Sequence, residues 1–171
     1  KNNELDLNNL ELSDATKEVI NTFEAVKNSR KKYGLTSINT WIVAMTGSSD
    51  DLTSIAFLAL FTKTVESKKD LSGFRIVPLL ETIGDLKNAN EILNNFWKNI
   101  YEEGSLVEVM IGYSDSSKDG GIIKSQWNLY SSQKEIFYLS KQLKLDLVLF
   151  HGRGGSSSRG GGPSGEAILS Q

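Results

Sequence analysis

The sequence contains no cysteine, only two prolines, a single histidine and no long apolar run. Without cysteine there can be no disulfide, no thiol nucleophile and no thiolate metal ligand, which suits a cytoplasmic protein. No apolar stretch approaches the roughly 20 residues that a membrane-spanning helix needs. The first residues are rich in Asn, Asp and Glu, so they lack the apolar centre of a secretory signal peptide. We therefore expect a cytoplasmic protein that does not contact a membrane.

Charge is nearly balanced, with 19 Lys and Arg against 21 Asp and Glu, which gives a net charge of −2. This balance argues against broad nucleic-acid binding through a basic surface. A length of 171 residues is enough for one domain with a buried core. We expect a poorly ordered segment over residues 1–12 and a single domain over 13–171. The sequence does not begin with Met and stops soon after the apolar stretch Ala167–Leu169, so we expect an internal piece of a longer protein.

Helical and strand patterns alternate along the chain. A helix is predicted from Ser13 to Gly34, because Ser13 can cap its start and glycine suits its end. Short apolar runs then alternate with helical patterns, an order typical of a parallel sheet covered by helices. The pattern predicts strands over 38–46, 74–80, 106–113 and 146–150, with helices that begin near Ser49 and Asp85 and a long helix over 121–144. The order helix, then β-α-β-α-β-α-β fits either a doubly wound sheet or part of a (β/α)8 barrel.

The long predicted helix carries a wide apolar stripe. Apolar residues recur in it every seven positions, and further apolar residues flank them, which indicates one buried face. The stripe comprises Ile122, Leu129, Ile136 and Leu143, flanked by Ile123, Tyr130 and Phe137.

Polar residues follow three of the predicted strands directly. Glu81 follows the second strand, Asp115 and Lys118 follow the third, and His151 and Arg153 follow the fourth. Because the carboxyl ends of parallel strands meet at one edge, where ligands bind, we expect these residues to share one pocket.

The residue types suggest a site for an anionic substrate and a metal. Glu81 and Asp115, on separate strand ends, suit a hard divalent cation that keeps several waters and also binds substrate. The guanidinium groups of Arg153 and Arg159 can bind phosphate or carboxylate with two parallel hydrogen bonds. The glycines between them allow backbone N–H groups to approach an anion. His151 can transfer a proton near neutral pH.

Simpler explanations stand beside these. Glu81 could be a helix cap or a solvated residue, and Ser114–Ser116 could serve only a turn. Lys118 and Asp119 could form a solvated pair. The glycine-rich run over 151–165 could be a linker or an Arg-Gly tract that binds RNA, and another phosphate-binding α/β enzyme would also fit.

Three segments resemble the phosphoenolpyruvate carboxylase family. The first, Val109–Gly121 (VMIGYSDSSKDGG), resembles a signature of that family over its whole length. The second, Phe150–Gly155 (FHGRGG) with Arg159–Pro163 (RGGGP), is similar to its glycine-rich catalytic loop. The third, Pro78–Thr82 (PLLET), is similar to a Pro-Leu-Phe-Glu-Thr segment.

The resemblance implies a partial (β/α)8 barrel from an enzyme that adds bicarbonate to phosphoenolpyruvate, giving oxaloacetate and phosphate. It implies Mg²⁺ or Mn²⁺ held by Glu81 and Asp115, and a homotetrameric parent protein, whose isolated fragment we expect to self-associate. The residues implied to bind substrate or act in catalysis are His151, Lys118, Arg153, Gly154, Gly155 and Arg159.

Two departures from the family pattern matter. Ser158 stands where the family usually has a glycine before its second loop arginine. The family's upstream motif Thr-Ala-His-Pro-Thr-Glu does not occur in the sequence. We therefore expect these 171 residues alone to lack the activity.

Overall fold

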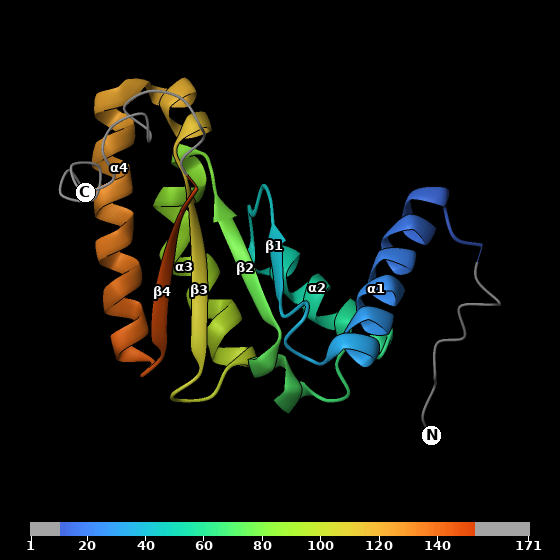
Figure 1. The fold of residues 1–171 in the computed structure, drawn as a ribbon. Coiled ribbons are helices and arrows are strands. Elements are labelled where there is room, and N and C mark those ends of the chain that lie inside the picture. The colour runs from blue at the N-terminus through green and yellow to red at the C-terminus, as the bar shows by residue number, and fades with distance from the viewer. Residues whose placement is uncertain (1–10, 153–171) are drawn as a thin grey trace.

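The computed structural model describes residues 11–152, which form a four-stranded sheet and its helices (Figure 1). The strands lie in the order β1-β2-β3-β4, and every neighbouring pair is parallel. The strands are β1 (Thr40–Val43), β2 (Arg75–Leu80), β3 (Leu106–Gly112) and β4 (Asp146–Gly152). The helices are α1 (Asp14–Tyr33), α2 (Ser49–Phe61), α3 (Ile83–Ile100) and α4 (Ser114–Gln142), with a short 3-10 helix η2 (Lys68–Gly73) before β2. The predicted alternation of strands and helices is confirmed.

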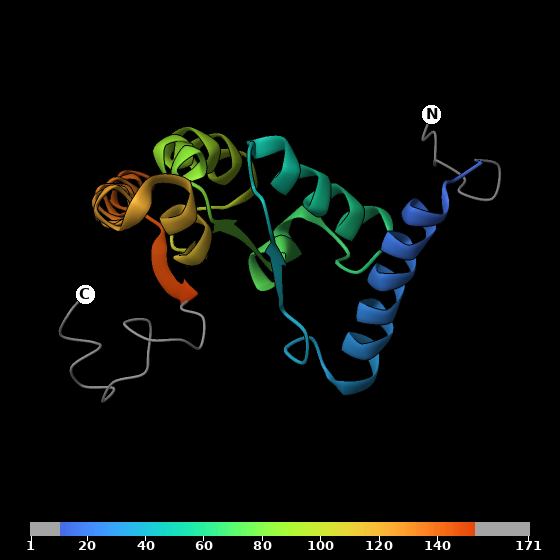
Figure 2. The ribbon, with the colours of Figure 1, turned by 90° about the horizontal axis from the view of Figure 1, so that it is seen from above.

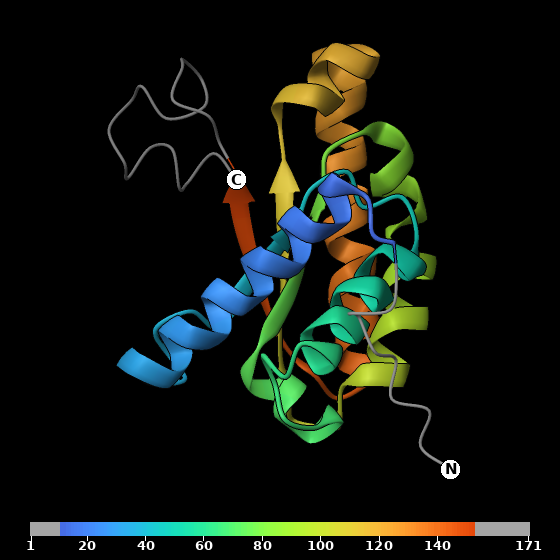
Figure 3. The same cartoon turned by 90° about the vertical axis from the view of Figure 1, so that its right-hand side faces the viewer.

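Helices α2, α3 and α4 lie in a row over one face of the sheet (Figure 2). The strands point the same way, as the arrowheads of β3 and β4 show (Figure 3). Alternate strand residues face these helices and are buried with the apolar sides of the helices. This core includes Ile76, Leu80, Val109 and Ile111 from the strands and Leu93, Leu129 and Ile136 from the helices. The arrangement is that of a partial (β/α) barrel.

The opposite face of the sheet is partly open. Met110 and Phe150 are paired in the β3–β4 register, and strand alternation places both on the face away from the buried Ile111. Phe150 is 50% exposed and Val148, two residues earlier on the same face, is 41% exposed. In a closed barrel this face forms the packed interior.

Helix α1 has the predicted ends. The Ser13 hydroxyl accepts a hydrogen bond from the Thr16 N–H (3.2 Å), and the Gly34 N–H donates to the Arg30 carbonyl (3.0 Å). The helix packs beside β1 through Phe23, whose ring stacks on Trp41 at a centroid distance of 4.2 Å.

Helix α4 differs from the prediction. It begins at Ser114 rather than near 121, and Gly121, with a φ of 75°, interrupts the helical backbone and kinks it. Leu129 and Ile136 are buried as predicted, but the expected burial of the wider stripe is wrong. Because α4 is the outermost helix of the row, one side packs on α3 and the sheet and the other side is uncovered by described residues. Four stripe residues are exposed, namely Ile122 (64%), Ile123 (85%), Tyr130 (61%) and Phe137 (48%). Within residues 11–152 no helix is both long and apolar enough to cross a membrane.

Candidate functional site

Glu81 is the first residue after β2 and connects the carboxyl ends of two strands. Its Oε1 accepts a hydrogen bond from the backbone N–H of Met45, which follows β1, at 2.9 Å. Its own N–H donates to Asp85 Oδ2 at 3.2 Å. The side chain of Glu81 is therefore held at the sheet edge by its neighbours, and it is half-buried.

The start of α3 determines the path of the chain after Glu81. Thr82 and Asp85 cap the helix reciprocally: the Asp85 N–H donates to Thr82 Oγ1 (3.1 Å) and the Thr82 N–H donates to Asp85 Oδ2 (2.9 Å). The helix thus begins at Ile83, two residues before the predicted start, because Asp85 acts from the third helical position. Glu81 is therefore not the capping residue of α3, because Thr82 and Asp85 cap that helix.

Asp115 lies in the first turn of α4, just after β3, and Lys118 lies three residues further along the helix. Lys118 Nζ lies 2.9 Å from Asp115 Oδ1, and both side chains are open to solvent, at 74% and 45%. The hydrogen bond and positive charge of Lys118 hold the pKa of the Asp115 carboxyl below its ordinary value, against a smaller opposing effect of burial. Asp115 is therefore an anion under ordinary conditions, as a metal ligand must be.

Glu81 and Asp115 line the same cavity, of about 350 Å³. Met45, Thr82 and Asp85 complete its lining. The structure thus brings together carboxylates from the ends of two neighbouring strands. Lys118 and His151 lie outside this lining.

The cavity can be tested for its fit to a divalent cation. Residues 11–152 contain no cluster of three or more His, Cys, Asp or Glu that could hold a metal. Mg²⁺, however, is commonly bound by one or two carboxylates, while waters and substrate oxygens complete its coordination. Glu81 and Asp115 match that donor set, whereas Asp85 is already engaged as the cap of α3.

His151 lies near the end of β4 and is bound to a neighbouring strand end. Its Nδ1 forms a hydrogen bond of 2.5 Å with the hydroxyl of Tyr113, which is buried at the end of β3. This contact orients the imidazole ring and depends on its tautomer. Tyr113 was not predicted as a site residue, because in the sequence it is only the last residue of a predicted strand.

The glycine-rich segment lies beyond the described part of the chain. That part ends at Gly152, where an added Cβ would lie 3.1 Å from the Ile111 carbonyl oxygen and 2.7 Å from Met110 Cε. Glycine therefore allows β4 to pack closely on β3 as it reaches the site. Four predicted site residues fall outside the described residues, namely Arg153, Gly154, Gly155 and Arg159.

The residues after Lys118 have structural roles that were not predicted. Asp119 Oδ2 accepts a hydrogen bond from the Ile83 N–H at 3.2 Å, so it connects the start of α4 to the start of α3. A Cβ at Gly120 would collide with Ile83 Cδ1, which shows how closely the two helices approach. The alternative of a solvated Lys118–Asp119 pair is wrong, because each side chain has a different partner.

Comparison with known proteins gives consistent matches. A sequence model of the family described as phosphoenolpyruvate carboxylase matches residues 1–171. Phosphoenolpyruvate carboxylase of Synechococcus sp. is 36% identical over 166 residues, which cover 93% of this chain and 16% of the relative. The enzymes of that name from Thermosynechococcus vestitus and Gloeobacter violaceus are each 36% identical, over 95% of the chain and 17% and 18% of their own lengths.

The chain therefore spans about a sixth of the length of these curated relatives. The family match covers the whole chain, including the segments that carry Glu81, Asp115 and His151. Since the match is continuous and the relatives agree with it, the chain belongs to the phosphoenolpyruvate carboxylase family.

Proposed function

We propose that the chain is part of a phosphoenolpyruvate carboxylase, a lyase that adds bicarbonate to phosphoenolpyruvate to give oxaloacetate and phosphate. The observation that carries the proposal is the cavity lined by Glu81 and Asp115, at the carboxyl edge of the sheet in a chain of this family. This edge is where (β/α)8 enzymes place their active sites.

Glu81 and Asp115 would hold Mg²⁺ or Mn²⁺. Such a cation supplies stabilisation of negative charge on the enolate oxygen of the substrate. The Met45 N–H holds the Glu81 carboxylate in place, and Lys118 keeps Asp115 ionised. These contacts orient both carboxylates before any ligand binds, so little reorganisation is needed.

The remaining site residues would bind the anionic substrates. Arg153 and Arg159 would bind the phosphate and carboxylate groups, and the backbone N–H groups of Gly154 and Gly155 would add hydrogen bonds. Lys118 and His151 would place further positive charge or a proton donor near the reacting groups. Tyr113, which bonds His151 Nδ1, would fix the orientation of that ring beside the substrate.

The metal assignment is tested by Asp115→Asn in the full-length protein. The substitution removes the charge but keeps the size, and we expect oxaloacetate formation to fall by about 100-fold, the scale of losing one electrostatic contact at developing charge. Oxaloacetate is measured by coupling to malate dehydrogenase over a range of Mn²⁺ concentrations. Asp50→Asn, in the exposed first turn of α2, is the matched control and should leave the rate unchanged. A rate for Asp115→Asn equal to that of the control would remove Asp115 from the ligand set.

The 171 residues alone should form no oxaloacetate, because the histidine motif of the family is absent from them. The same coupled assay on the purified chain tests this expectation. Turnover comparable with that of the full-length protein would show that these residues contain a complete site.

A further inference from the structure

A second cavity, of about 910 Å³, lies at the opposite edge of the sheet, where β2 begins. The end of α1, the loop after it and the segment from α2 to η2 form its walls. Its volume lies within the range of small-molecule sites. Two acids, Glu66 and Asp70, also line it. Its cationic lining residues are Lys27, Arg30, Lys31, Lys63 and Lys69.

Arg30 is the most buried of these cations, with 5% of its surface exposed. Its Nη1 donates to the carbonyls of Leu35 (2.8 Å) and Ile38 (2.6 Å), and its guanidinium lies 5.2 Å from the centre of the Phe74 ring. Its Nε is buried without a hydrogen-bond partner, and no carboxylate of the described residues forms an ion pair with it. Burial lowers the pKa of the guanidinium. A buried charge without a counter-ion is costly, and an anion in the cavity would offset that cost.

The lysines of the cavity are mostly available for a ligand. Lys27 is engaged by Glu24 and by the Thr62 carbonyl. Among the described residues, Lys31, Lys63 and Lys69 form no ion pair.

The dipole of helix α1 explains the position of only some of the cationic residues that line the cavity. Basic residues at the end of a helix stabilise its negative pole, which accounts for Arg30 and Lys31. Lys63 and Lys69 come from other segments of the chain, so the helix does not account for them. The whole chain is net negative, so this gathering of cations is local.

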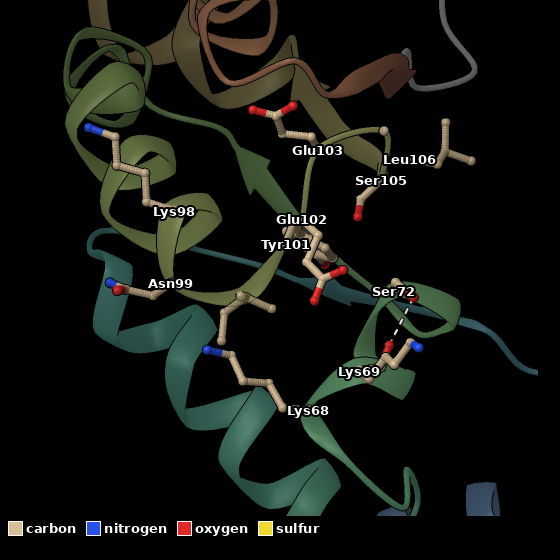
Figure 4. A pocket seen from close by; sticks show the side chains of 12 residues that line it. Lys68, Lys69, Ser72, Lys98, Asn99, Tyr101, Glu102, Glu103, Ser105 and Leu106 are labelled. Carbon is tan, nitrogen blue, oxygen red and sulfur yellow. Dashed lines mark hydrogen bonds between the residues drawn. The ribbon is translucent and has the colours of Figure 1, made fainter.

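An adjacent cavity of about 700 Å³ provides a contrast (Figure 4). It shares Lys69 with the cavity beside α1, and Lys68 and Lys98 add two more cations. Glu102 and Glu103, on the connection between α3 and β3, offset two of its three lysines. The excess of positive charge is therefore larger in the cavity beside α1, where five cations face two acids.

We propose that the cavity beside α1 binds a small polyanion that carries phosphate or carboxylate groups. The proposal does not depend on the proposed activity, since β2 separates this cavity from Glu81 by about 20 Å, at about 3.3 Å for each of its six residues. The ligand joins α1 to the segment between α2 and β2, because cations from both face it. Binding of an anion should therefore slow the hydrogen exchange of backbone amides in α1. It should also produce a saturable binding isotherm.

Titration calorimetry at low ionic strength tests the proposal with inorganic pyrophosphate and, separately, with citrate. The double variant Lys63→Gln/Lys69→Gln alters exposed residues only, so its fold should be retained, which circular dichroism checks. The matched control Lys87→Gln/Lys134→Gln removes two exposed lysines elsewhere, on α3 and α4. The 171-residue chain and the full-length protein to which we assign it are tested in parallel.

We expect saturable 1:1 binding that the cavity variant weakens by about tenfold or more, as for loss of a charge-assisted contact, while the control retains it. Binding of pyrophosphate alone assigns the site to phosphate groups, and equal binding of citrate extends it to carboxylates. Absence of saturable binding, or equal weakening by both double variants, would overturn the proposal. Binding by the short chain but not by the full-length protein would also overturn it, since the rest of the protein would then cover the cavity.

Discussion

Replacing Gly112 by alanine tests how closely β2 and β3 approach each other beside the candidate site. Gly112 ends β3, and a Cβ added there would lie 3.1 Å from Glu81 Cα, 3.2 Å from the Leu80 carbonyl oxygen and 3.4 Å from Glu81 Cβ. Carbon atoms in favourable contact are about 3.5–4.0 Å apart. The neighbouring strand ends must therefore separate by several tenths of an ångström to admit the methyl group.

The size of the effect follows from what is contacted. Two of the three close atoms are backbone atoms at the end of a paired strand, which cannot turn aside as a flexible side chain can. Overpacking of this kind costs about 1–3 kcal/mol, and the lower entropy of the unfolded alanine chain returns about 0.4–1 kcal/mol. We expect a net loss of about 1–2 kcal/mol, which for a chain of this length lowers Tm by roughly 3–6 °C.

Thermal unfolding followed by circular dichroism measures this loss. Gly73→Ala is the matched control, because a Cβ at Gly73 would meet no atom within 4 Å and its φ is not positive. That control should raise stability by about 0.4–1 kcal/mol. The shift of Glu81 in Gly112→Ala should also weaken Mn²⁺ binding, which electron paramagnetic resonance of free Mn²⁺ detects. Equal Tm values for the two variants would refute the close approach of the strands.

Three further predictions concern single side chains. Asp119→Ala removes the acceptor of the Ile83 N–H and should cost about 1 kcal/mol of unfolding free energy in urea; Asp119→Asn should recover most of it, and equal losses would contradict the contact. Lys118→Met should raise the pKa of Asp115 towards its ordinary value, and a carboxyl NMR titration that shows no change would disprove the coupling. Burial raises the pKa of Tyr101 to about 12, so above a pH of about 10 the unfolded chain ionises this phenol before the folded chain does. Stability should therefore fall as the pH rises from about 10 to 12, and a similar fall in Tyr101→Phe, followed by urea unfolding, would count against this explanation.

Local sequence signals predicted the order of the elements well. The cap at Ser13 and the glycine at the end of α1 lie where they were expected, because caps act over one turn of the chain. The helix boundaries near Thr82 and Gly121 were less predictable. At the first, the capping residue Asp85 lies inside the helix. At the second, α4 continues through a kink at a glycine that was expected to mark its start.

The candidate site was only partly visible in the sequence. The meeting of Glu81 and Asp115 in one cavity was predicted, because both follow apolar strands of a parallel sheet. Met45 and Tyr113 were not found, because their partners Glu81 and His151 lie 36 and 38 positions away and no local pattern connects them. The unpartnered Nε of Arg30 also becomes evident only when the chain is folded, since its burial depends on several elements.

The sequence by itself determined the alternation of strands and helices, and hence the parallel sheet whose carboxyl edge gathers the polar residues, because apolar runs and helix caps act over a few residues. It also determined the family through motifs that contain Glu81, Asp115 and His151. Only the tertiary structure decided which side of α4 is buried and which cations surround the cavity beside α1. Those features arise from packing between segments distant in the chain, and residue spacing alone does not specify that packing.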